Sequence, residues 1–181
     1  MAGRTPAEAV NNYLAPLQRA ISCVTNSVLN VRGGYHPAPA PHPLALAGGD
    51  PVPLHSNPSI SLSVLQHYRI VEYEGPSGPW KVSIVSYYYS LEDAGEDSGK
   101  REILYHWHPQ GLSAVTFPHV HIRTGGQLGD TNIGGVHFPT GLIALEDVLR
   151  LAIREFGVDP RRADWMDVLD SSQAAYDDWR R

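Results

Sequence analysis

The first thirty residues carry apolar side chains at the spacing of an α-helix. A start signal precedes them, because Thr5 can cap the helix, Pro6 suits its first turn and Glu8 completes a capping box. The apolar positions that follow at helical spacing are Tyr13, Leu14, Leu17, Ile21, Val24, Val28 and Leu29. We therefore predict an N-terminal helix within residues 1–32 that continues to about Asn30, with a kink or a break at Pro16.

The second segment, residues 33–59, has no such periodicity. It contains seven prolines and four glycines, a composition that ends the helix and favours extended, polyproline-like chain. We interpret this segment as a linker or surface loop that buries no core, and keep a docking segment as the alternative.

Strand-like patterns begin at residue 60. Gly/Pro-rich or charged turns separate five runs that favour strands, at residues 64–73, 80–91, 102–108, 118–123 and 135–138. The connections between these runs are too short for helical crossovers, so we predict a mainly antiparallel sheet of about five strands.

An amphipathic helix is expected next, near residues 143–156, and would complete an α+β core at residues 60–157. Its apolar stripe, which we expect to pack on the sheet, consists of Leu145, Val148, Leu149, Ala152 and Phe156. Gly157 is suited to end this helix. Glu146 and Asp147 lie in its first turn, where negative charge favours the helix dipole.

The last segment, residues 158–181, is expected to form two short helices, at 161–169 and 171–180, with Ser171 as the second cap. Its aromatic residues are Trp165, Tyr176 and Trp179. We expect them to dock onto the main domain or onto a second subunit, which would make the protein a homo-oligomer.

Composition narrows the class of protein. The chain has 181 residues, a net charge of −5 and no apolar run that approaches a membrane span. An acidic chain without a basic face is a poor nonspecific nucleic-acid binder, although one local contact with RNA stays open. Cys23 is the single cysteine, so a disulfide within the chain is excluded, and we expect a buried, inert thiol. With no signal-peptide pattern at its start, a soluble cytoplasmic protein is expected, without a membrane partner.

Histidines gather in one stretch of the predicted sheet. His106 and His108 flank Trp107, His119 and His121 flank Val120, and His137 follows in the next strand. Residues i and i+2 of a strand share a face. If the two segments pair as a hairpin, with His106 near His121 and His108 near His119, four imidazoles come within cross-strand reach.

Three functions suit this cluster. Neutral imidazole binds transition metals, with His106, His108, His119, His121 and His137 as the candidate ligands. Alternatively, a pair of histidines can act as acid and base without a metal, and Arg123, on the same face as His121, can hold a phosphate. The third interpretation is a set of packed or solvent-facing histidines with no activity. The remaining histidines, at positions 36, 42, 55 and 67, are expected to be structural or exposed.

The segments around the cluster resemble the TumE-like family of bacterial toxin–antitoxin toxins. The resemblance covers roughly residues 60–156 and rests on YHWHP, FPHVHI and the helix LEDVLRLAI. Its matching positions are Tyr105, His106, Phe117, Pro118, His119 and His121. It implies a small α+β protein of bacterial origin that acts with a cognate antitoxin protein, on RNA.

Three hypotheses follow for function. The first is a TumE-like toxin that cleaves RNA without a metal, with His106 and His121 as acid and base and with His119 and Arg123 steadying the phosphate. The second is a His-ligated metalloprotein that is cupin-like in its chemistry, either an oxygenase or a hydrolase, with one transition metal as its cofactor. The third is a non-catalytic module that binds a protein through its sheet or its C-terminal aromatic residues.

Overall fold

The computed structural model describes residues 2–94, 101–110, 113–123 and 126–180. Two long strands form its centre: β5 (Ile60–Glu72) and β6 (Trp80–Asp93). They pair antiparallel along their full length, from Ile60 opposite Asp93 to Glu72 opposite Trp80, with an irregularity at His67/Tyr68. The turn between them is the predicted Gly/Pro cluster at residues 73–79.

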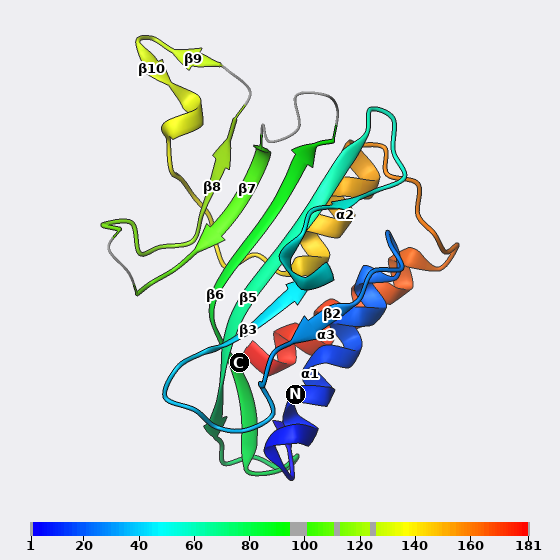
Figure 1. Ribbon diagram of the computed structural model, residues 1–181, viewed down its shortest axis with the longest axis vertical. Coiled ribbons are helices and arrows are strands. Elements are labelled where there is room, and N and C mark those ends of the chain that lie inside the picture. Colours follow the sequence, from blue (N-terminus) through cyan, green and yellow to red (C-terminus); the bar gives the residue numbers. More distant parts are fainter. Residues whose placement is uncertain (1, 95–100, 111–112, 124–125, 181) are drawn as a thin grey trace.

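A nine-stranded sheet is built around this hairpin, in the order β11-β8-β7-β6-β5-β3-β2, with β1 also paired to β6 and β4 to β5 (Figure 1). The α+β class and the antiparallel sheet are therefore confirmed, whereas five strands was too few. The further strands are β1 (Ala2–Gly3), β2 (Leu29–Val31), β3 (His42–Leu46), β4 (Val52–Pro53), β7 (Arg101–Trp107), β8 (His119–Ile122) and β11 (Phe138–Pro139). A separate hairpin, β9 (Gln127–Leu128) with β10 (Thr131–Asn132), projects beyond the sheet.

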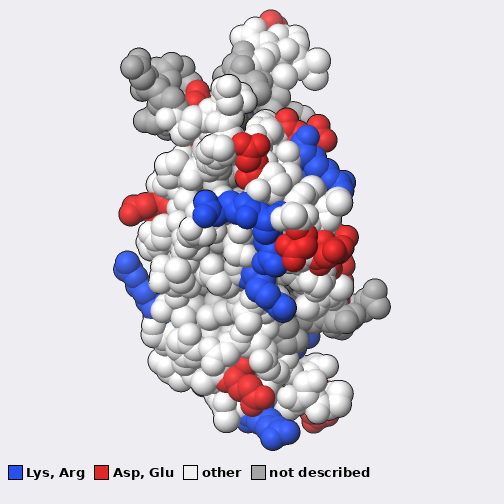
Figure 2. All heavy atoms as spheres, turned by 90° about the vertical axis from the view of Figure 1, so that its right-hand side faces the viewer, with Lys and Arg blue, Asp and Glu red and all other residues white. Residues whose placement is uncertain are grey.

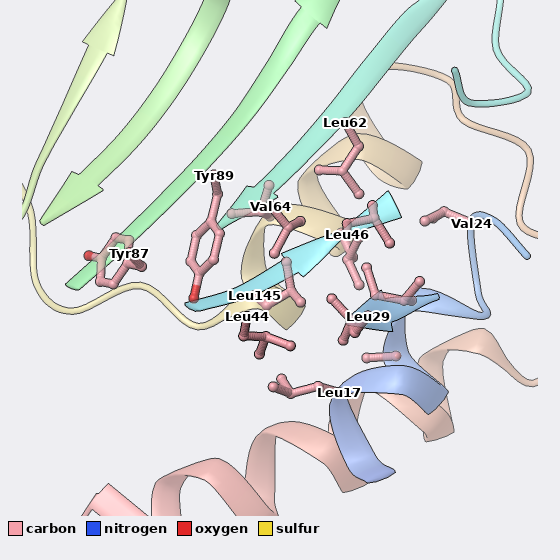
Figure 3. Close-up of a cluster of buried hydrophobic side chains, with 14 of the residues drawn as sticks. Leu17, Val24, Leu29, Leu44, Leu46, Leu62, Val64, Tyr87, Tyr89 and Leu145 are labelled. Carbon is pink, nitrogen blue, oxygen red and sulfur yellow. The ribbon is translucent and has the colours of Figure 1, made fainter. Parts of the chain in front are cut away.

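Three helices cover one face of the sheet: α1 (Pro6–Ile21), α2 (Leu145–Glu155) and α3 (Trp165–Arg180). Alternate residues of β5 and β6 face them, so Leu62, Val64 and Tyr89 are buried in one apolar core (Figure 3). Among these described helices none has the length and apolarity that a membrane span requires. Figure 2 shows basic and acidic side chains interspersed on one side of the molecule.

The N-terminal helix is shorter than predicted. Its capping signal is confirmed, because the Glu8 backbone N–H donates to the Thr5 hydroxyl at 3.1 Å, and α1 runs through Pro16 as one helix. It ends at Ile21, however, and not near Asn30. The side chain of Gln18 explains the ending, since it accepts from the Leu29 backbone and donates to the Ser27 carbonyl, which holds the chain in a reversal.

The Pro-rich segment is not the coreless loop that its composition suggested. It contains β3, β4 and the short helix η1 (Ala47–Gly49), and both β3 and β4 pair with β5. Leu44 and Leu46 of β3 are fully buried. Pro43, which precedes Leu44, is accommodated because its side chain lies on the other face of the strand and is only partly buried.

The C-terminal helices also differ from the prediction in part. The helix α2 lies within two residues of its expected bounds, and Gly157 follows it with a positive φ of 65°, as predicted. The extension, in contrast, forms a single helix from Trp165. Ser171 does not cap a new helix, because its hydroxyl donates to the Val168 carbonyl within α3. The side chain of Trp179 lies outside the described residues.

Candidate functional site

The two histidine-bearing strands are neighbours, as the hairpin assumption required. Strands β7 and β8 pair antiparallel, with His106 opposite His119 and Leu104 opposite His121. The predicted register, His106 with His121 and His108 with His119, is therefore wrong by two residues. A shift of two keeps every side chain on its face, so the cluster is preserved.

Strand alternation places the cluster on the sheet face away from the helices. Tyr105 and Trp107 pack against the hydrophobic core, so His106 between them points to the opposite side. Its cross-strand neighbour there is Tyr88 of β6, whose ring meets the imidazole edge-on, with centroids 5.9 Å apart. Sequence reasoning missed Tyr88, because its position depends on the β6–β7 register.

The imidazoles form one continuous group. His119 lies at its centre, with ring centroids 5.2 Å from His106, 5.0 Å from His121 and 4.8 Å from His137. His121 is 4.5 Å from His137, and His108 is 4.2 Å from His106. All five predicted residues therefore come together.

Three of the five are close enough to share one ion. His106, His119 and His121 each offer a ring nitrogen, and these atoms all lie within 4.8 Å of one another; this is the single such group of histidine, cysteine and acidic residues in the described part of the chain. His108 and His137 lie at the margin of the group. His137 is exposed and precedes β11 in a loop, after the short helix η2 (Ile133–Gly135), and not in the strand that was expected.

One backbone carbonyl orients the ring of His119. Its Nδ1 lies 2.9 Å from the carbonyl oxygen of Phe117, a distance at which the nitrogen donates. Its Nε2 is buried and has no hydrogen-bond partner among the described residues, and the same is true of Nδ1 of His121. Because neutral imidazole has one donor and one acceptor nitrogen, Nε2 of His119 carries a buried lone pair.

Burial and mutual repulsion keep two rings of the cluster, His106 and His121, neutral. Desolvation is the largest cause that lowers the pKa of both His106 and His121 to about 4, and the neighbouring histidines add to it. Arg123 contributes to the low pKa of His121, whereas a hydrogen bond with the Val136 backbone acts the other way. At neutral pH both rings are therefore unprotonated, the form that binds metal ions.

Arg123 follows the last residue of β8 and is exposed. Its positive charge is one of the smaller causes that lower the pKa of His121, after desolvation and the neighbouring histidines. The turn of η2 lies beside its stem: a Cβ atom built on Gly134 would lie 3.7 Å from Cγ of Arg123.

The other four histidines contact structural partners. Nε2 of His42 lies 2.8 Å from the His36 carbonyl oxygen, and His67 pairs with the Ser86 hydroxyl at 3.0 Å. His55 lies on the surface and pairs with Asp159. Cys23 is buried as predicted, and burial raises the pKa of its thiol, which disfavours the thiolate.

Comparisons of the chain with protein-family models, with curated proteins and with solved structures found no significant match.

Proposed function

We propose that the protein is a His-ligated metalloprotein in which His106, His119 and His121 hold one transition-metal ion. The observation that carries this proposal is the convergence of three ring nitrogens within 4.8 Å, from two adjacent strands of a packed sheet. In a tetrahedral site the nitrogens around zinc would lie roughly 3.4 Å apart, given metal–nitrogen bonds of about 2.1 Å. Metal binding would therefore draw the three ring nitrogens closer together.

The hydrogen bonds around the rings support the same conclusion. Histidines that bind a metal through one nitrogen commonly donate the other N–H to a carbonyl, which fixes the tautomer. His119 has this arrangement, with Nδ1 on the Phe117 carbonyl and Nε2 buried without a partner among the described residues. A buried, unsatisfied polar atom is costly, and a bound cation would remove that cost.

The ligand set favours hydrolytic chemistry over oxygenase chemistry. Non-haem iron oxygenases typically use two histidines and one carboxylate, and the group found among the described residues contains histidines alone. Three neutral histidines with an open fourth position are typical of catalytic zinc. Such an ion, when bound, lowers the pKa of a coordinated water to about 7 and polarises an oxygen of the substrate.

A TumE-like toxin that cleaves RNA without a metal is the second candidate, with a cognate antitoxin as its partner. It is favoured by the position of His106 and His121 on one face, 6.5 Å apart between ring centroids, beside Arg123. A general acid, however, must carry a proton at the working pH. With the pKa of both rings at about 4, the pair has no proton to donate at neutral pH, so this candidate ranks below the metal site.

Metal content tests the first candidate directly. The protein, purified without a polyhistidine tag and without chelator, is expected to contain about one transition-metal ion per chain by inductively coupled plasma mass spectrometry. The His119→Ala/His121→Ala variant is expected to contain none. His55→Ala, which removes an exposed histidine outside the cluster, is the matched control and should retain the metal. Equal metal content in all three proteins would contradict the proposal.

A further inference from the structure

Arg123 is an exposed residue that follows β8, two positions after His121, and it has no carboxylate partner among the described side chains. Within the residues whose side chains are described, Arg123 makes no hydrogen bond and no ion pair. Other arginines of the same chain are paired: Arg150 with Asp147 and Asp170, and Arg162 with Asp164. The guanidinium group of Arg123 is therefore available to bind a ligand from solvent.

The chain path places Arg123 next to the cluster, because it directly follows β8 and lies two residues after His121. His119, His121 and Arg123 are alternate residues of one extended segment and share its face. The Gly134 turn lies beside the Arg123 side chain, since a Cβ atom built on Gly134 would lie 3.7 Å from Cγ of Arg123. An anion bound at the open position of the metal would therefore meet the guanidinium as well.

The charges of the loaded site favour a substrate with more than one negative charge. Three neutral imidazoles leave the two positive charges of a divalent ion uncompensated, and Arg123 adds a third. The metal-ligand group among the described residues includes no carboxylate. A phosphoryl group offers two charges and three oxygens, and guanidinium binds phosphate oxygens through two parallel hydrogen bonds. A carboxylate offers one charge and two oxygens.

We propose that the substrate of this centre carries a phosphoryl group, with one oxygen at the metal and the others held by Arg123. This inference rests on the proposed metal site. Arg123 is a binding residue in this account, and the metal is held without it.

Phosphate binding to the metal-loaded protein tests the inference. Zinc-loaded protein, freed of excess zinc, is titrated with inorganic phosphate in a calorimeter, as wild type and as Arg123→Gln and Arg123→Lys. We expect Arg123→Gln to weaken phosphate binding at least tenfold. The phosphate affinity of Arg123→Lys should lie between those of wild type and Arg123→Gln, because lysine keeps the charge and loses the bidentate geometry. Arg69→Gln is the matched control, since Arg69 lies on the central strand β5, three strands from β8. It should leave phosphate affinity within twofold of wild type.

The outcomes separate this inference from the proposed function. If all the variants bind one zinc ion but Arg123→Gln binds phosphate as wild type does, the role of Arg123 is overturned and the metal site stands. Acetate bound as tightly as phosphate by the wild type would overturn the phosphoryl assignment alone. If the wild type binds no zinc, the metal site itself fails and this inference fails with it.

Discussion

Nδ1 of His119 lies 2.9 Å from the carbonyl oxygen of Phe117, two residues earlier in the chain. This bond fixes the tautomer of the central imidazole, so the lone pair is on Nε2, which is buried and unsatisfied among the described residues. Because the acceptor is a backbone atom, the orientation is a property of the chain path into β8.

Replacing His119 by asparagine separates the fold from the metal site. The asparagine amide can reach the Phe117 carbonyl as Nδ1 does, but it has no atom at the position of Nε2. We expect His119→Asn to keep its thermal melting temperature without metal within a few degrees of wild type. Its zinc affinity, measured by competition with a chromophoric chelator, should fall at least about 100-fold, as for loss of a ligand.

The marginal histidines should matter less than the three central ones. His108→Ala and His137→Ala are each expected to reduce zinc affinity by less than about tenfold, the lower end of effects from outside the ligand set. The same competition assay, run beside His106→Ala, gives the comparison. A loss of metal from His137→Ala as complete as that from His106→Ala would show that His137 is a fourth ligand.

The stability of the metal-free protein should depend on pH through His106 and His121. Their folded-state pKa of about 4 lies below the ordinary value of 6.5, so the unfolded chain binds more protons between these values. The contribution of these two rings to the free energy of unfolding is therefore fully present above pH 6.5. It is lost as the pH is lowered toward 4. Melting temperatures in chelator from pH 7.5 to 4 should show this fall, and a His106→Gln/His121→Gln variant should show a smaller one.

Glu146 lies in the first turn of α2, as predicted, and its side chain is fully buried. Ser172 of α3 donates to one of its oxygens, and the other has no hydrogen-bond partner among the described residues. Burial raises the pKa of this carboxyl, so its contribution to stability is lost as the pH rises through the folded-state pKa.

Two substitutions test this buried carboxyl. Glu146→Gln keeps the shape and removes the charge, and we expect it to stabilise the protein by about 1 kcal/mol at pH 8 and by less at pH 5. Ser172→Ala leaves the carboxyl without its donor and should cost about 1–3 kcal/mol in urea unfolding. If Glu146→Gln gains less stability over wild type at pH 8 than at pH 5, the raised pKa of Glu146 is contradicted.

The strand found in the Pro-rich segment gives a prediction about the core. Leu44→Ala in β3 is expected to lower the free energy of unfolding by about 2–5 kcal/mol, because the side chain is fully buried. Leu128→Ala, in the projecting hairpin, is the control, since Leu128 is 79% exposed. If Leu44→Ala and Leu128→Ala both change the free energy of unfolding by the same small amount in denaturant, residues 42–46 do not belong to the core.

The parts of the fold that could be predicted are those whose signals are local. Alternation marked β5, β6 and β7, and the stripe with Gly157 marked α2. The end of α1 could not be predicted, because Val24 and Leu29 continue the helical spacing while the distant contacts of Gln18 reverse the chain. In residues 33–59 the alternation of Leu44 and Leu46 was present but was outweighed by the prolines around it.

In the candidate site, too, only the features with a local sequence signal could be predicted. Period-two spacing was enough to put His119 and His121 on one face, and the face survives the error in register. The features that distinguish a metal site from a group of histidines without a function cannot be read from the spacing of residues along the sequence. They are the Phe117 carbonyl on His119, the Tyr88 ring beside His106 and the burial that holds the pKa of two rings low. The ring contact and the burial depend on strand pairing, which the sequence does not encode locally, and the carbonyl contact depends on the chain path into β8.

The central claim is that three named histidines bind one metal ion, and calorimetric titration of the metal-free protein with zinc tests it most directly. We predict one site per chain for wild type and for His55→Ala, and zinc binding at least about 100-fold weaker for His106→Ala and His119→Asn. Zinc bound equally by His119→Asn and wild type, or not bound by the folded wild type, would contradict the account.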